Sequence, residues 1–252
     1  SAASDVYKRQ VVKRTSACLA VTVALMLATP FAGADSLGAP VMEPREASWT
    51  FNVLLDDRPI GYHRFDLRGA GEVEQVDIEA RFEVEVFFVT AYRYAHDNRE
   101  TWRGDCLKGI EAITDDNGDE YRVRGAADAE GFSIERNDES DSVDTRCLKT
   151  FAYWNPEILG AERLLNAQTG EVKDVTIEAL GPAPFDVGGV TVASEAYLLT
   201  MADGAIRLWY EQGSGQWLGL ETRTRGDRTL RYEPAALPNP PEGMPLAEVV
   251  FP

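Results

Sequence analysis

The chain lacks most of the side chains and motifs on which enzyme chemistry depends. Its 252 residues include two histidines, His63 and His96, so imidazole catalysis has two candidates. No G-x-S-x-G nucleophile elbow, H-E-x-x-H zinc motif, phosphate-binding loop or dinucleotide fingerprint is present. We therefore predict no catalytic residue, no metal site and no cofactor, although absent motifs alone leave enzyme activity open.

Positive charge is also scarce. Lys and Arg total 25 against 42 Asp and Glu, which gives a formal net charge of −17. Such an excess repels phosphate backbones and anionic lipid surfaces over a Debye length of ~8 to 10 Å. We expect no nucleic-acid partner, and an acidic, solvated surface.

No apolar run reaches the ~20 residues that a membrane-spanning helix needs. The apolar run over residues 17–28 follows Lys13-Arg14 and precedes the small-residue triplet Ala32-Gly33-Ala34. This order predicts a signal peptide over residues 11–34, cleavage after Ala34, a periplasmic or otherwise exported protein and no transmembrane span after processing. Residues 1–10 contain no initiator Met and are interpreted as a translated sequencing adapter.

Cysteine is rare, with three in the chain. Cys18 precedes most of the apolar run, so it is not placed as a lipidated cysteine would be, whereas Cys106 and Cys147 remain after cleavage. Export to an oxidising compartment favours a Cys106–Cys147 disulfide. The alternative is a pair of free thiols, of which Cys106 could act as a nucleophile with His96 as its base.

Alternation of apolar and polar residues dominates what is present. From Val76 to Phe88 every second residue is apolar, and Trp49 to Leu55 and His63 to Leu67 follow the same pattern. Turn sequences separate such segments, including Asp56-Asp57-Arg58-Pro59 and Asn117-Gly118. Further strands are predicted at residues 91–103, 107–114, 120–124, 132–136, 172–179, 191–200, 205–211, 217–225 and 229–233.

This pattern predicts a mainly β fold: a single curved antiparallel sheet that forms a β-roll or open half-barrel, with one short helix. The helix is expected from Asn155, a capping residue, through Pro156 to Asn166, where it could plug the open end. The acidic stretch Asp138 to Asp144 is interpreted as a loop. We assign residues 35–45 to a disordered linker, 46–233 to the β-rich domain and 234–252 to a Pro-rich tail.

One predicted strand carries a row of aromatic and polar side chains on a single face: Tyr92, Tyr94, His96, Asn98, Glu100 and Trp102. Such a row either lines a ligand cavity or forms an ordinary sheet face with polar tips. We select Tyr92, Tyr94, His96 and Trp102 as ligand-lining candidates, with Trp209 and Trp217 next. His63, on an apolar face, is interpreted as a core histidine, and Asp115 to Glu120 as a hairpin turn rather than a calcium loop.

Several ordered segments together resemble a family of exported bacterial proteins, DUF6134, over roughly Trp49 to Tyr232. The segments are Pro59–Phe65, Tyr92-Arg93-Tyr94 with His96, Trp102-Arg103, Cys106-Leu107, Thr114–Gly118, Tyr153–Pro156 and Leu164–Gly170. The general pattern is also similar to DUF3108 and to half-barrel lipoprotein carriers such as LolA and LolB. The resemblance implies an exported protein without an established activity, so it assigns no catalytic residue.

Three functional hypotheses follow. The first is non-enzymatic binding of a hydrophobic or lipid-like small molecule in the curved sheet. The second is a protein-interaction module in envelope assembly, with an envelope protein bound through a sheet edge or the Pro-rich tail. The third is a hydrolase that uses His96 with Asp97 or Glu100 as its acidic partner.

Overall fold

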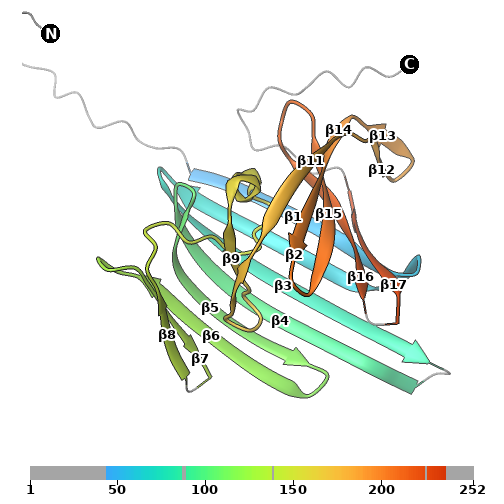
Figure 1. The fold of residues 1–252 in the computed structure, drawn as a ribbon. Coiled ribbons are helices and arrows are strands. Elements are labelled where there is room, and N and C mark those ends of the chain that lie inside the picture. The colour runs from blue at the N-terminus through green and yellow to red at the C-terminus, as the bar shows by residue number, and fades with distance from the viewer. Residues whose placement is uncertain (1–43, 87–88, 138, 225, 237–252) are drawn as a thin grey trace, which may run out of the picture. The chain divides into compact units, whose positions relative to one another are not determined.

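The computed structural model describes residues 44–86, 89–137, 139–224 and 226–236. Within these residues thirteen strands form one antiparallel sheet in the order β11-β14-β15-β16-β17-β1-β2-β3-β4-β5-β6-β7-β8 (Figure 1). β17 pairs with β1, so the last strand of the domain lies beside the first. β11 and β8 are the two edges, and the sheet does not close into a barrel. The predicted mainly β fold with one curved antiparallel sheet is confirmed.

The strands of this sheet are, in chain order, β1 (Pro44–Leu55), β2 (Arg58–Ala70), β3 (Val73–Val86), β4 (Val89–Arg103), β5 (Cys106–Asp116), β6 (Asp119–Ala127), β7 (Phe132–Arg136), β8 (Glu139–Val143), β11 (Thr176–Pro182), β14 (Ser194–Met201), β15 (Gly204–Glu211), β16 (Trp217–Thr224) and β17 (Arg228–Pro234). Two small hairpins accompany them: β9 (Arg163–Leu165) with β10 (Val172–Asp174), and β12 (Phe185–Val187) with β13 (Val190–Val192). Two predicted strands, 172–179 and 191–200, are therefore each split into two.

Several predictions fall on residues outside this description. They are the adapter segment 1–10, the signal peptide 11–34 with cleavage after Ala34, most of the 35–45 linker and the tail from residue 237. They stay predictions.

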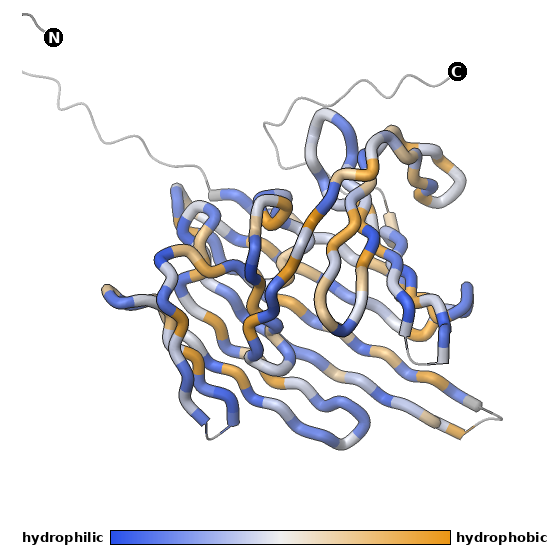
Figure 2. The backbone as a smooth tube through the Cα atoms, viewed as in Figure 1, coloured by the Kyte–Doolittle hydropathy of each residue, from blue (hydrophilic) through white to orange (hydrophobic). Residues whose placement is uncertain are grey.

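Alternation along the strands produces the two faces of the sheet, visible as alternating apolar and polar bands in Figure 2. In β3, Val76 and Ile78 are buried on the inner face, whereas Asp77 on the outer face binds Arg99 at 2.7 Å and Arg68 at 3.2 Å. The predicted turns are confirmed. Asp56 and Asp57 have φ of 50° and 62°, and Asn117 and Gly118 have φ of 55° and 100°, as a type I′ hairpin requires.

Residues 144–175, here called the crossing segment, leave the β8 edge and pass over the inner face of the sheet (yellow in Figure 1). Its buried apolar residues join the main core; they are Leu148, Ala152, Ile158, Leu164, Leu165 and Val175. Trp154 contacts Trp102 edge to face at 5.5 Å between ring centroids. Because a curved open sheet cannot cover its own inner face, the crossing segment supplies the missing layer of the core.

The predicted helix is much shorter than expected. Only a 3₁₀ helix, η1 (Pro156–Gly160), forms, with the Asn155 side chain accepting a hydrogen bond from the amide of Glu157. The prediction of helix up to Asn166 is wrong, since Leu164 and Leu165 belong to strand β9. Pairing of β9 with β10, and a parallel bridge between Thr150 and Leu165, satisfy the backbone there instead.

The prediction of a loop over Asp138 to Asp144 is wrong for Glu139–Val143. Glu139–Val143 forms strand β8, which pairs with β7 as an edge strand. Its side chains are largely exposed, so no apolar alternation marks it in the sequence. Acidic residues on an edge strand discourage pairing with another copy of the same edge.

The predicted disulfide is confirmed. Cys106 at the start of β5 is bonded to Cys147 in the crossing segment, with their Cα atoms 4.7 Å apart. The next residues continue the contact, because the amide of Leu107 donates to the carbonyl of Leu148 at 2.9 Å. The disulfide therefore fixes the crossing segment to the sheet where it begins to cover the core.

Candidate functional site

The six residues of the predicted row on β4 share the inner face of the sheet. Tyr92 and Tyr94 are partly buried, and the row becomes fully buried from His96 onward. At the far end Trp102 has no exposed surface. The row thus begins at the margin of the core and ends inside it.

The partly exposed end of the row is aromatic. Phe82 on β3 stacks on Tyr94 with ring centroids 5.0 Å apart and planes 10° from parallel. The Tyr94 hydroxyl donates to Gln168 Oε1 at 3.2 Å, and the Tyr92 hydroxyl donates to Asp116 Oδ1 at 2.7 Å. Burial, assisted at Tyr92 by the Asp116 carboxylate, raises the pKa of both hydroxyls. Both tyrosines therefore stay neutral, and present ring faces with polar tips.

The two histidines lie on the same face in one cross-strand row. His63 on β2 is opposite Ala80 on β3, which is opposite His96 on β4, which is opposite Thr114 on β5. His96 Nδ1 lies 2.8 Å from the Thr114 hydroxyl, and burial lowers the pKa of His96 to about 4. His63 stacks on Phe65 at 4.3 Å, and burial lowers its pKa to about 3. Both imidazoles are neutral at pH 7.

This burial predicts a pH dependence of stability. Each histidine has a lower pKa in the folded chain than its usual 6.5. Between pH 6.5 and about 4 the unfolded chain therefore binds more protons than the folded chain, and the free energy of unfolding decreases as the pH falls. For His96 the loss between pH 7 and 5.5 is about 1 kcal/mol. Denaturant titrations of His96→Gln at both pH values are expected to show a smaller acid-induced loss than the parent chain. An equal loss in both proteins would contradict the assignment.

The acidic partners required by the hydrolase hypothesis do not reach His96. Asp97 lies on the outer face, where both its carboxylate oxygens accept from Arg81 at 2.7 and 2.9 Å. Glu100 accepts from Asn98 Nδ2 and Trp102 Nε1, both at 2.9 Å. Cys106 is held in the disulfide, so it is no free thiol for His96 to activate.

Glu100 supplies the one carboxyl group of the row and is deeply buried, with 1% of its surface exposed. Burial raises its pKa, and the hydrogen bonds from Asn98 and Trp102 oppose that rise in part. Thr150 of the crossing segment also faces it, although the Thr150 hydroxyl and Asn98 Oδ1 have no hydrogen-bond partner among the described residues. This polar cluster links β4 to the crossing segment inside the core.

The two other candidate tryptophans lie apart from each other. Trp217 is buried in the main core, with its ring centroid 4.1 Å from that of Phe51, and its indole N–H donates to the carbonyl of Gly219 at 2.8 Å. Trp209 belongs to a second apolar cluster on the outer face, with Phe185, Val187 and Leu218. The candidate residues therefore share the inner face except for Trp209.

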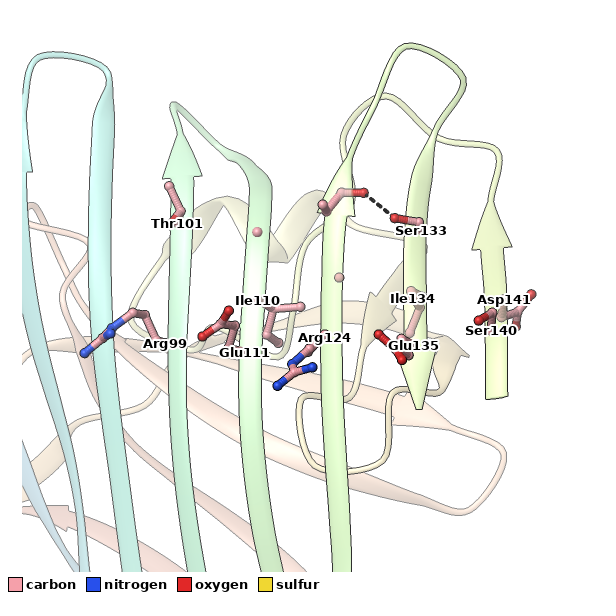
Figure 3. Close-up of a pocket in the computed structure, with 13 residues that line it drawn as sticks. Arg99, Thr101, Ile110, Glu111, Arg124, Ser133, Ile134, Glu135, Ser140 and Asp141 are labelled. Atoms are coloured by element: carbon pink, nitrogen blue, oxygen red, sulfur yellow. Dashed lines mark hydrogen bonds between the residues drawn. The ribbon is translucent and has the colours of Figure 1, made fainter. Parts of the chain in front are cut away.

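A groove of about 610 Å³ lies on the outer face of strands β4 to β8. Figure 3 shows four of its charged residues at one level on successive strands, Arg99, Glu111, Arg124 and Glu135, followed by Ser140. These five residues are directly opposite one another in the strand register. A fifth charged residue, Asp141 on β8, pairs with Arg136 at 3.2 Å. The groove thus presents alternating charges from adjacent strands.

Comparison with protein families decides which family the chain belongs to. The model of DUF6134, described as a domain of unknown function, matches residues 51–235. The chain belongs to the DUF6134 family. Comparison of this DUF6134 chain with curated proteins finds no match.

The solved structures that are similar in fold include a β-barrel-like protein of the domain of unknown function DUF1849 from Brucella abortus. It superposes with a TM-score of 0.55 at 11% identity, over 77% of this chain and 98% of the other. At that identity the similarity concerns the fold alone.

The sequence of this DUF6134 chain gave no sign of the outer groove. Arg99, Glu111, Arg124 and Glu135 lie 11 to 13 residues apart and form no local motif. Only the pairing register of β4 to β7 places them side by side. No group of three His, Cys, Asp or Glu side chains in the described ranges is arranged to hold a metal ion, and no helix there is long and apolar enough to cross a membrane.

Proposed function

We propose that this protein is an exported, non-catalytic binding protein whose inner sheet face holds a hydrophobic or lipid-like molecule. The observation that carries the proposal is the stacked pair of Phe82 and Tyr94: both rings are partly exposed, and Phe82 packs against the main core. Partly exposed aromatic rings beside a core provide apolar contact area for a ligand. Export is supported by the Cys106–Cys147 disulfide, since disulfides persist in oxidising compartments.

The polar groups of the same face suit an uncharged or amphipathic ligand. Tyr92 and Tyr94 supply neutral hydroxyls, and the nearby imidazole of His96 is neutral at pH 7. A hydrocarbon chain would lie against Phe82 and Tyr94, while a polar end would reach the tyrosine hydroxyls. Trp102 and Trp217 lie deeper, in the packed core, and would support such a site from beneath.

The test is extraction and identification of molecules bound to the protein purified from its own compartment, followed by titration with a fluorescent fatty acid. Phe82→Ala and Tyr94→Ala are each expected to weaken binding of the probe several-fold, because each removes apolar contact area. Tyr62→Ala is the matched control, since Tyr62 is 36% exposed on the outer face. Protein that carries no extractable lipid and does not bind the probe would refute the proposal.

A protein-interaction function is a second candidate, favoured by the edge strand β8. It pairs with β7 on one side, and its other side offers backbone groups to an added strand. A stoichiometric partner that copurifies with the parent chain and is lost with Ser140→Pro would support this function. Retention of the partner by that variant would exclude the β8 edge.

A further inference from the structure

The floor of the outer groove includes a row of small residues. Thr101, Gly109, Ala126 and Ser133 are opposite one another on β4 to β7, next to the charged row. The Ser133 hydroxyl is turned toward the sheet, where it donates to the carbonyl of Ala126 at 3.1 Å (Figure 3). A ligand resting on this floor could approach the backbone closely.

The charges above this floor are incompletely paired. Arg99 binds Asp77 of β3 at 2.7 Å. In contrast, Glu111, Arg124 and Glu135 make no ion pair and no side-chain hydrogen bond among the residues that the structure describes. Arg124 stands between the two carboxylates, one strand away from each, and all three side chains are exposed. A carboxylate that can bind a cation therefore lies on each side of the Arg124 guanidinium, which can bind an anion.

We propose that this groove binds small zwitterions, namely free amino acids or short peptides. The ligand carboxylate pairs with the Arg124 guanidinium, whose planar donors match a carboxylate. The ligand ammonium pairs with Glu111 or Glu135, about 4.8 Å away on the neighbouring strands. The small residues of the floor leave room for the ligand backbone to lie close to the sheet.

Other ligand classes fit less well. A simple anion would meet Glu111 and Glu135 as well as Arg124, and the net charge of −17 adds to the repulsion. A polycation would meet Arg99 and Arg124. A purely apolar molecule would leave these charges without water or partners. The volume of about 610 Å³ is in the range of small-molecule sites.

This groove is independent of the proposed lipid site, because the two lie on opposite faces of the sheet. Arg99 and Thr101 point to the outer face of β4, whereas Tyr94 and His96 point to the inner face. Loss of one function would leave the other intact.

The experiment is an NMR titration of the full chain with four forms of one dipeptide: glycylglycine, its amide, N-acetylglycylglycine and the doubly blocked neutral form. Zwitterionic glycylglycine is expected to shift the amide signals of Gly109, Gly125 and Ala126 and to bind more tightly than the forms with one charge or none. Arg124→Gln is expected to weaken it about fivefold, the upper range for one exposed ion pair.

Arg122→Gln is the matched control, because Arg122 lies two residues away on the same face of β6 and pairs with Glu120 at 2.6 Å outside the groove. It should bind like the parent chain, and Glu135→Gln should bind the zwitterion more weakly. Absence of shifts at the groove amides, equal binding of the neutral form, or unchanged affinity in Arg124→Gln would overturn the proposal.

Discussion

Replacing Trp102 with alanine is expected to lower the free energy of unfolding by about 3–5 kcal/mol, the usual cost of deleting a buried tryptophan. Trp102 has no exposed surface and contacts Trp154 of the crossing segment at 5.5 Å between ring centroids. Its indole N–H also donates to Glu100 at 2.9 Å, so the substitution removes one of the two donors of a buried carboxyl group. Guanidinium denaturation monitored by circular dichroism measures the loss.

The matched control is Trp209→Ala, which removes the same side chain from the small outer cluster, where it is only partly buried. A loss well below that of Trp102→Ala is expected, because less apolar surface returns to water. If Trp102 served mainly as a ligand contact, Trp102→Ala would unfold like the parent chain while binding of the lipid probe fell. That result would contradict the core assignment.

Removing the disulfide is expected to cost about 3–4 kcal/mol in the chain-entropy model. Cys106 and Cys147 are 41 residues apart, and their bond holds the crossing segment against β5. The double variant Cys106→Ser/Cys147→Ser should unfold at a clearly lower denaturant concentration than the parent chain. Its inner core should loosen first around Leu148, the buried residue that follows the bond.

A reductant supplies the control for this prediction. It should lower the stability of the parent chain to that of the double variant, and should leave the double variant unchanged. Equal midpoints for the oxidised parent chain and the double variant would show that the bond is not formed or does not constrain the unfolded chain.

The long strands could be predicted from the sequence because each contains its own alternation of apolar and polar residues. Val76, Ile78 and Ala80 alternate with charged residues, and this alternation by itself indicates which face of β3 is buried. It does so independently of the strands with which β3 pairs. The hairpin at Asn117-Gly118 is equally local, since positive φ is required at adjacent positions. For the same reason the row from Tyr92 to Trp102 was assigned to one face correctly.

Elements that depend on distant partners were read less well. Leu164 and Leu165 fit an apolar helix stripe, yet the buried strand β9 forms because Val172 and Thr150 come to lie beside them. Strand β8 carries acidic residues with no apolar face, and only the unpaired edge of β7 explains it. In the sequence Trp209 and Trp217 were both selected as candidates for one ligand site. A β-bulge in the pairing of β15 with β16, together with the β12–β13 hairpin, instead places Trp209 in an outer cluster that no local sequence pattern indicates.

Local sequence patterns thus determined the β class, most strand positions and the hairpin turns, and they correctly indicated that Cys106 and Cys147 form a disulfide. The signal peptide stays a prediction. The strand order, the crossing segment that fills the inner face and the alternating charges of the outer groove arise from pairing between segments far apart in the chain. Side-chain periodicity records which face of a strand is buried, but register and order depend on the sum of many weak contacts across the whole sheet. Those contacts exist only in the folded chain.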